Sequence, residues 1–194
     1  MKLTQSIKVL EDIHPTQEIL NYNFTELISN TEYSYPNMFP TIFGNLRTYG
    51  IVSFPAELWK NETQVRSNHR IIRVTSSSYP NKLQLHTICL DNVKKLEEYY
   101  NGIAKIAVLD ILPPMGTIKE HVDISALYTF CHRVHLPLVT NGKVFFHVAG
   151  RAYNMTKGKF FEFDNKELHA VQNFSNETRI HLVVDLLPKS SVLL

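Results

Sequence analysis

The sequence lacks the features that define several large protein classes. Its only cysteines are Cys89 and Cys131, and a pair without motif spacing is expected as reduced buried thiols rather than as a disulfide framework. No apolar run approaches the ~20 residues of a membrane span, and the stretch from Met1 to Lys8 has no continuous apolar core of the kind found in signal peptides. We therefore expect a cytoplasmic protein that does not associate with membranes.

An excess of charge of one sign is also absent. The chain carries 20 lysines and arginines against 18 acidic residues, a net charge of +2, whereas a dedicated nucleic-acid binder has a larger basic excess. Hydrophobic residues at 44% and charged residues at 20% are ordinary for a soluble globular protein. We expect no nucleic-acid partner, and the sequence indicates no oligomeric state.

The length of 194 residues suits one domain with a sizeable core and is short for two. No repeat, low-complexity tract or linker composition divides the chain. We therefore expect residues 1–194 to form a single domain, in which residues 1–102 form a flanking region of helices and strands and residues 103–187 form a β core. The flanking region is expected to shape the substrate pocket.

The first hundred residues indicate a mixture of helix and strand. Apolar residues from Pro15 to Ser29 recur at helical spacing, which predicts an amphipathic helix. Residues Lys82 to Leu90 alternate between apolar and polar, which predicts a strand, and Asp91 is placed to cap a short helix that Gly102 closes. Other elements expected here are an edge strand or irregular lead-in over 1–14, an ordered aromatic loop over 30–43, strands over 49–54 and 69–75, and an exposed loop over 61–68.

From Ile103 onward the pattern is that of a β protein. Many short strands at close spacing are typical of a sandwich or barrel. The run from Pro113 to Gly116 predicts a tight turn, and Asn141-Gly142 is a hairpin signal between two strands. The strand-length runs cover residues 106–112, 118–123, 131–139, 144–148, 160–163, 170–173 and 178–187.

Two histidines and an aspartate are the candidate metal ligands. In an extended strand residues i and i+2 share a face, so His121 and Asp123 can grip one metal ion from adjacent positions. A buried carboxylate is unfavourable without a nearby cation. A third ligand must return from elsewhere in the chain, and His169 lies far enough downstream to do so on a facing strand. Two histidines and one carboxylate form the set that holds Fe(II) by one triangular face in non-haem oxygenases.

An arginine ten residues after His169 provides a candidate anion site. Arg179 lies in a run that reads as a buried strand, where an unpaired guanidinium is unfavourable. Its fork of donors suits a carboxylate, such as the one that 2-oxoglutarate carries at the end remote from its metal-chelating keto acid. A structural ion pair with a carboxylate, such as Asp164 or Asp185, is the alternative. His181 shares the face of Arg179 and either lines the same pocket or is a core histidine.

Five segments together carry a resemblance to a known family. They are His121-x-Asp123, Cys131-His-Arg133-Val-His135-Leu-Pro-Leu, Gly158-Lys-Phe-Phe-Glu-Phe-Asp164-Asn165, Leu168-His169-Ala-Val-Gln-Asn173 and Arg179-Ile-His-Leu-Val-Val-Asp185. The region from about Ile106 to Asp185 resembles the aspartyl/asparaginyl β-hydroxylase family of Fe(II)/2-oxoglutarate-dependent dioxygenases, which includes bacterial free-proline hydroxylases.

The resemblance implies a fold, a site and a reaction. The fold is a double-stranded β-helix, a jelly-roll of the cupin-like kind, with mainly β structure and flanking helices. His121, Asp123 and His169 are expected to bind Fe(II), Arg179 to hold the distal carboxylate of 2-oxoglutarate, and Arg133 and His135 to help hold this cosubstrate near the metal. The reaction is hydroxylation of an unactivated C–H bond in an amino acid or an amino-acid side chain of a peptide, of Asp/Asn or Pro type, with release of succinate and CO2.

Two alternatives stay open at this stage. AlkB-type nucleic-acid demethylases resemble the chain in HxD and the distal histidine, but they place a second arginine where this chain has Asp185. A non-catalytic cupin-like module that binds a metal or small molecule is the other alternative, although no residue of the triad is missing. One departure bears on the substrate: the animal peptide hydroxylases of the family have glycine where this chain has Asp123, so the complete triad is more similar to the bacterial members.

Overall fold

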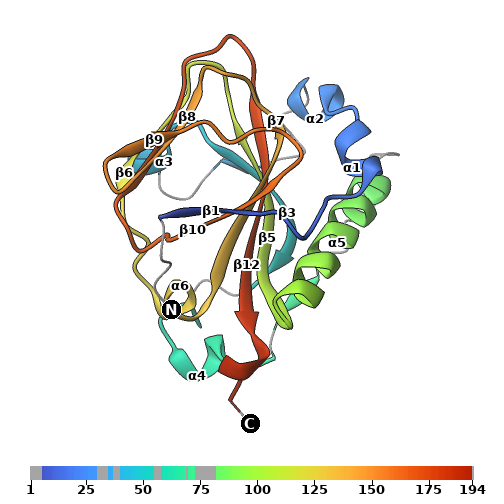
Figure 1. Ribbon diagram of the computed structural model, residues 1–194, viewed down its shortest axis with the longest axis vertical. Coiled ribbons are helices and arrows are strands. Elements are labelled where there is room, and N and C mark those ends of the chain that lie inside the picture. Colours follow the sequence, from blue (N-terminus) through green and yellow to red (C-terminus); the bar gives the residue numbers. More distant parts are fainter. Residues whose placement is uncertain are drawn as a thin grey trace.

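The computed structural model describes residues 6–29, 35–36, 40–54, 58–68, 70–72 and 82–193. Within these ranges the chain folds into two antiparallel sheets that face one another, with helices on the outer face of the larger sheet (Figure 1). This arrangement confirms the prediction of a mainly β protein with a jelly-roll core. No helix among the described residues has the length and apolar character needed to cross a membrane.

The larger sheet contains the longest strands of the fold. Its central strands are β12 and β5, which pair antiparallel along nearly their whole length. Strand β1 closes one edge through its pairing with β10. In order across the sheet the strands are β1 (Ile7–Leu10), β10 (Phe160–Phe163), β7 (His132–Val139), β12 (Arg179–Pro188), β5 (Gly102–Leu112), β3 (Arg47–Ser53) and β2 (Tyr35–Pro36), and β4 (Ile71–Ile72) also pairs with β3.

The smaller sheet carries two of the candidate ligands. Its central pair joins β11 to β6 and β8. In order across the sheet the strands are β6 (Thr117–His121), β11 (His169–Asn173), β8 (Val144–Val148) and β9 (Arg151–Tyr153).

Helix α5 (Lys82–Tyr99) lies across the outer face of the larger sheet, against β5, β12 and β3 (Figure 1). Helix α1 (Gln17–Asn21) packs on α5 in turn. A 3-10 helix, Lys189–Ser191, follows β12. The remaining helices are α2 (Thr25–Ser29), α3 (Pro40–Phe43), α4 (Glu62–Val65) and α6 (Ala126–Phe130).

Strand β12 separates two environments. Ile180, Leu182, Val184 and Leu186 belong to the apolar cluster between the larger sheet and α5. Because side chains alternate along a strand, Arg179, His181 and Asp185 point the other way, into the interior between the two sheets. A second apolar cluster fills part of this interior with side chains from both sheets, among them Phe163 of β10 and Phe146 of β8. The interior between the sheets is therefore lined partly by apolar side chains and partly by ionisable ones.

The strand predicted over Lys82–Leu90 is wrong, because these residues form the first half of α5. The buried residues Leu85, Cys89, Val93 and Leu96 recur at intervals of three and four, which places them on one side of a helix. Leu83, two residues before Leu85, is 64% exposed. Alternation over a few residues cannot distinguish a short strand from one stretch of a helix, and the longer helical period decides here.

The helix predicted over Pro15–Ser29 is interrupted. Thr16 caps α1 by accepting a hydrogen bond from the backbone N–H of Ile19, and the chain is extended at Tyr22. Asn23 then accepts a hydrogen bond from the N–H of Thr25 at the start of α2, at 3.0 Å. A local side-chain acceptor thus competes with continuation of the first helix.

Other predictions for the N-terminal half are met in part. Strand β3 confirms the strand predicted over 49–54, and β1 is the edge strand predicted within 1–14. Helix α4 lies within the loop predicted over 61–68. Of the strand predicted over 69–75, residues 69 and 73–75 lie outside the described residues, and β4 occupies part of the rest. Of the aromatic loop predicted over 30–43, residues 30–34 and 37–39 lie outside the described residues, and β2 and α3 occupy the rest.

The predicted β runs of the C-terminal half are confirmed as strands, although β6 ends at His121 and not at residue 123, and β9 and α6 occur in addition. The hairpin predicted at Asn141-Gly142 is wrong. A turn is present, closed by a 3.1 Å hydrogen bond from the N–H of Val144 to the carbonyl of Asn141, but β7 and β8 belong to different sheets. The turn carries the chain from one sheet to the other, as a jelly-roll requires.

Candidate active site

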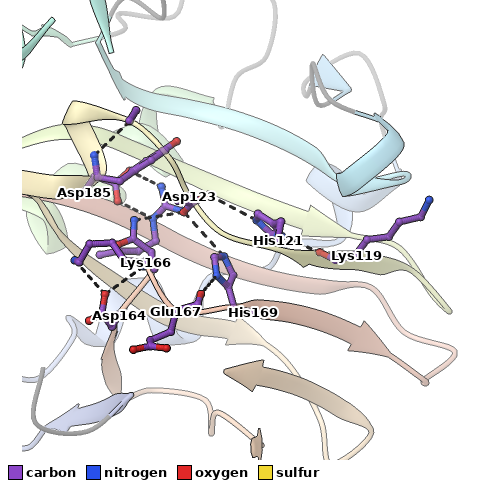
Figure 2. Close-up of polar contacts among 12 residues, drawn as sticks. Lys119, His121, Asp123, Asp164, Lys166, Glu167, His169 and Asp185 are labelled. Atoms are coloured by element: carbon purple, nitrogen blue, oxygen red, sulfur yellow. Dashed lines mark hydrogen bonds and ion pairs between the residues drawn. The ribbon is translucent and has the colours of Figure 1, made fainter. Parts of the chain in front are cut away.

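His121 and His169 face each other across two strands of the smaller sheet. They are directly paired in the antiparallel register of β6 and β11, and Asp123 follows β6 by two residues (Figure 2). One ligand atom from each of the three side chains lies within 4.8 Å of the other two. The structure therefore brings together the three residues that the sequence predicted as metal ligands.

Both imidazoles are held in the form that leaves Nε2 free for a metal. His121 Nδ1 lies 2.7 Å from the carbonyl oxygen of Lys119, and His169 Nδ1 lies 2.8 Å from the carbonyl oxygen of Glu167 (Figure 2). A carbonyl oxygen only accepts, so each Nδ1 carries the proton and each Nε2 presents a lone pair. Such outer hydrogen bonds fix ring orientation at metal sites.

Asp123 reaches the same point from outside the sheet. Strand β6 ends at His121, so the regular strand on which the i, i+2 prediction relied does not extend to the aspartate. The backbone N–H of Asp123 instead donates to the carbonyl of Asn165 at 3.1 Å. Its Oδ1 lies 3.6 Å from His121 Nε2, and its Oδ2 lies 4.0 Å from His169 Nε2.

Aromatic rings enclose the two imidazoles. The ring of Phe163 packs edge-on against His169 with 5.1 Å between centroids, and Phe146 lies parallel to the same imidazole at 6.3 Å. Phe43 packs edge-on against His121 at 5.0 Å. Burial lowers the pKa of His169 to about 4, so this imidazole is neutral at neutral pH, as a metal ligand must be.

Arg179 lies buried in the interior, where only 1% of its surface is exposed. Its Nη2 donates to His181 Nδ1 at 2.7 Å, while its Nε and Nη1 have no hydrogen-bond partner among the described residues. Burial lowers the pKa of Arg179 to about 10 and Asp110 opposes this effect, so the guanidinium remains charged at neutral pH. A buried cation with free donors fits an anionic ligand.

The two carboxylates named as possible structural partners of Arg179 pair elsewhere, and the carboxylate that acts on Arg179 electrostatically is Asp110. Asp164 pairs with Lys166 at 3.0 Å, and Asp185 pairs with Arg133 at 2.7 Å. Neither carboxylate that the sequence offered as a partner contacts Arg179.

Two further histidines extend the polar interior from Arg179 toward the metal ligands. His181 Nδ1 accepts from Arg179, so its Nε2 carries the proton, and this buried donor has no partner among the described residues. His135 Nδ1 lies 3.3 Å from His181 Nδ1, and its ring contacts Phe163, which also packs on His169. Burial, with Arg179 nearby, lowers the pKa of both His135 and His181 well below the usual range.

Arg133 lies close to two carboxylates. Its Nε and Nη2 donate to Asp185 at 2.7 and 2.8 Å, and its Nη1 donates to Oδ2 of Asp123. Arg133 and His135, two residues apart on β7, both point into the interior, where they contact Asp185 and His181. Burial alone lowers the pKa of Arg133, but Asp123 and Asp185 outweigh it and raise the value well above the usual one.

Sequence reasoning assigned no role to Asp110 of β5. The residue is directly paired with His181 on one side and with Thr48 on the other, so it faces the same interior as Arg179. Burial raises its pKa to about 6, although Arg179 and Arg133 oppose the shift. The signal in the sequence was a single carboxylate in an otherwise apolar strand, Ile106 to Leu112.

The donor set fits Fe(II) and 2-oxoglutarate. Two imidazole nitrogens and one carboxylate oxygen suit a metal ion that keeps open positions, and the unpartnered donors of Arg179 and His181 suit the carboxylate of a dicarboxylic acid held in the same interior.

Comparisons with known proteins agree with this chemistry. A sequence model of the family described as Aspartyl/Asparaginyl beta-hydroxylase matches residues 57–188, more than half of the chain. No match is found among curated proteins.

Solved structures of a 2OG-Fe(II) oxygenase and of two prolyl hydroxylases share the fold. A Pseudomonas putida prolyl-4-hydroxylase is similar with a TM-score of 0.56 and 11% identity, over 95% of this chain and 93% of that one. A 2OG-Fe(II) oxygenase family oxidoreductase from Burkholderia pseudomallei gives 0.53 at 12% identity, over 80% and 73%. A prolyl hydroxylase from Trichoplax adhaerens, in complex with a hypoxia inducible factor peptide fragment, gives 0.53 at 10% identity, over 97% and 86%.

The family match and the geometry of the interior lead to the same assignment. The matched residues include the three clustered ligands and Arg179, and the fold is that of the oxygenases above. The chain belongs to the aspartyl/asparaginyl β-hydroxylase family and is a 2-oxoglutarate-dependent dioxygenase whose cofactors are Fe(II) and 2-oxoglutarate.

Proposed function

We propose that this enzyme hydroxylates an unactivated C–H bond of a free amino acid or of an amino-acid side chain in a peptide, of Asp/Asn or Pro type. When bound, the cofactors supply the oxidising chemistry: O2 and 2-oxoglutarate are consumed, one oxygen atom enters the substrate as hydroxyl, and succinate and CO2 are released. The observation that carries the proposal is the cluster of His121, Asp123 and His169 in the same interior as a buried arginine with free donors.

His121, Asp123 and His169 are the proposed ligands of Fe(II). The Nδ1 protons of both histidines are held by backbone carbonyls, which directs both Nε2 lone pairs toward the metal position. Held by these three residues, Fe(II) would keep positions open for further ligands.

Arg179 is the proposed holder of the distal carboxylate of 2-oxoglutarate. Its Nε and Nη1 donors and the Nε2 donor of His181 are buried and free among the described residues, so together they offer three donors to one anion. His135 lies between this group and His169 and is the proposed neighbour of the cosubstrate along its length. Satisfying these donors with an anion removes the unfavourable burial of an unpaired charge.

The peptide bound to the Trichoplax adhaerens enzyme is a reason to include peptides beside free amino acids among the candidates.

Turnover screening tests the proposal. The protein would be incubated with Fe(II), 2-oxoglutarate and O2 and with proline, aspartate, asparagine or short peptides that contain them. Succinate would be followed by NMR and a product mass increase of one oxygen atom by mass spectrometry. We expect both signals to rise together with one substrate and to be lost in His121→Ala. Metal binding without succinate from any candidate would instead favour the non-catalytic cupin-like module.

A further inference from the structure

We propose that Arg133 is a positioning residue for Asp123: anchored by Asp185, it holds one carboxylate oxygen of Asp123 so that the other faces the metal position. The inference rests on the proposed function, because it assumes that Asp123 is a metal ligand. It differs from the role that the family resemblance implies, in which Arg133 helps to hold the cosubstrate.

Arg133 is fixed from the side opposite Asp123. It is directly paired with Asp185 in the register of β7 and β12, and the two side chains form a two-pronged ion pair at 2.7 and 2.8 Å. The ring of Tyr128, on α6, lies 4.5 Å from the guanidinium carbon. A planar guanidinium that is bound along one edge by a carboxylate and stacked on an aromatic ring is fixed in one orientation. In this orientation Nη1 points toward Asp123.

The contacts of Asp123 distinguish its two oxygens. Oδ2 accepts from Arg133 Nη1 and from Asn165 Nδ2, the latter at 3.3 Å. Oδ1 accepts no hydrogen bond from the described residues and lies 3.6 Å from His121 Nε2. Oδ2 also lies 4.0 Å from His169 Nε2, so both oxygens lie beside the metal position, but Oδ1 is the one that no donor among the described residues occupies.

Asp123 needs such a contact more than the two histidines do. Both histidines lie on paired strands, and a carbonyl within two residues fixes each ring. Asp123 lies beyond the end of β6, and the next residue, Ile124, is 88% exposed. Its backbone N–H is held by the carbonyl of Asn165, and its carboxylate is oriented by two side-chain contacts, of which the charged one comes from Arg133.

Asp185 also keeps the charge of Asp123 available. An arginine that paired with Asp123 alone would cancel the negative charge that attracts a divalent cation. The buried Asp185 carboxylate balances Arg133 at 2.7 Å, so the group of three side chains retains one net negative charge beside the metal position. Asp185 thus both fixes the orientation of Arg133 and balances its charge.

Metal binding in the absence of 2-oxoglutarate separates the two roles of Arg133. Mn(II) would be titrated into the wild-type protein, Arg133→Gln, Arg133→Lys and Asp185→Asn, with dissociation constants from calorimetry and ligand geometry from the electron paramagnetic resonance of the bound ion. Outer-shell partners of ligands typically change metal affinity by about 10- to 100-fold. We expect a loss of this size in Arg133→Gln, a loss in the same direction in Asp185→Asn, and a smaller loss in Arg133→Lys, which keeps the charge but not the fork.

Binding of 2-oxoglutarate at saturating Mn(II) provides the opposite readout. A positioning role predicts a dissociation constant for 2-oxoglutarate within a few-fold of wild type in the Arg133 variants, since Arg179 is unchanged. Wild-type Mn(II) affinity combined with weakened 2-oxoglutarate binding in Arg133→Gln would overturn the inference in favour of a cosubstrate ligand. Arg151→Gln, at an exposed arginine of β9, is the matched control and should bind both as wild type does.

The design also distinguishes failure of the inference from failure of the proposed function. If the wild-type protein does not bind Mn(II), the proposed metal site itself is wrong. If Arg133→Gln does not fold, as judged by near-ultraviolet circular dichroism, Arg133→Lys carries the test with the same signs, and wild-type Mn(II) affinity in that variant would overturn the inference.

Discussion

The imidazole rings of His121 and His169 lie 4.2 Å apart between their centroids, although the two residues are distant in the sequence. Antiparallel pairing of β6 with β11 places them side by side, and a register slip of one residue would turn one of them to the other face of the sheet. The metal site is therefore a property of strand register as much as of residue identity.

Metal binding should stabilise the fold through this site. A ligand present at about 100 times its dissociation constant stabilises the native state by about 2.7 kcal/mol. In a chain of this size each kcal/mol raises the melting temperature by about 2 to 4 °C. We expect Mn(II) to raise the melting temperature of the wild-type protein and of His147→Ala, in which a half-buried β8 histidine outside the triad is removed. Loss of the increase in His147→Ala, or its persistence in His169→Ala, would contradict the assignment.

Replacing Arg179 should have opposite effects on binding and on stability. In Arg179→Met the cosubstrate loses its charged partner, which typically costs about 2 to 5 kcal/mol of binding free energy, so the dissociation constant for 2-oxoglutarate should rise at least tenfold. Without cosubstrate, the variant should melt at a temperature equal to or higher than wild type, because an unpaired buried guanidinium is removed. Calorimetric titration and thermal melts with and without 2-oxoglutarate measure the two effects, and unchanged affinity would refute the assigned role.

The carboxyl group of Asp110 should make stability depend on pH. Its pKa is raised from 3.8 to about 6, mainly by burial, so the fold favours the protonated form. The resulting stabilisation is complete below the pKa of the unfolded chain and is lost as pH rises through about 6. The loss between about pH 4 and pH 6 is on the order of 2 kcal/mol. In Asp110→Asn the free energy of unfolding, measured by denaturant unfolding at a series of pH values, should lack this decrease between about pH 4 and pH 6. The same decrease in Asp110→Asn as in wild type would contradict the role of Asp110.

The same carboxylate should weaken cosubstrate binding. Asp110 acts on Arg179 electrostatically and faces the interior that the cosubstrate is proposed to enter. Since like charges repel, Asp110→Asn should lower the dissociation constant for 2-oxoglutarate at pH 8, where the carboxylate is ionised, and change it less at pH 5. Titrations at both pH values, with Thr48→Val as a neutral neighbour control, decide the point. Weaker binding at pH 8 would instead mean that Asp110 contacts the ligand favourably.

The sequence predicted the ligand set because the ligands follow an ordered pattern that recurs within a family. The roles of Asp185 and Asp110, which depend on pairing between distant strands, were not predicted. The sequence offered Asp185 as a possible partner of Arg179, whereas its pairing with Arg133 depends on the register of β7 and β12. Asp110 depends in the same way on the register of β5. Sequence periodicity indicates the face of a strand, but it does not give the neighbour across it.

The fold was predicted best where the chain alternates in paired strands and worst near helix α5. The strand prediction for Lys82–Leu90 assigned Leu83 and Leu85 to one face. In α5 the two side chains point in different directions: Leu85 is fully buried and Leu83 is 64% exposed. Packing of a long apolar stripe against β5 and β12 outweighs the local alternation.

A pair of alanine substitutions tests this assignment directly. Removing a fully buried leucine side chain typically costs about 2 to 5 kcal/mol, whereas surface substitutions stay within about 0.5 kcal/mol. Leu85→Ala should therefore lower the free energy of unfolding strongly and Leu83→Ala hardly at all. Urea unfolding followed by circular dichroism measures both values. A strand with both leucines on one buried face requires equal losses in the two variants. Equal losses would therefore contradict the assignment of α5 as a helix that covers the outer face of the larger sheet.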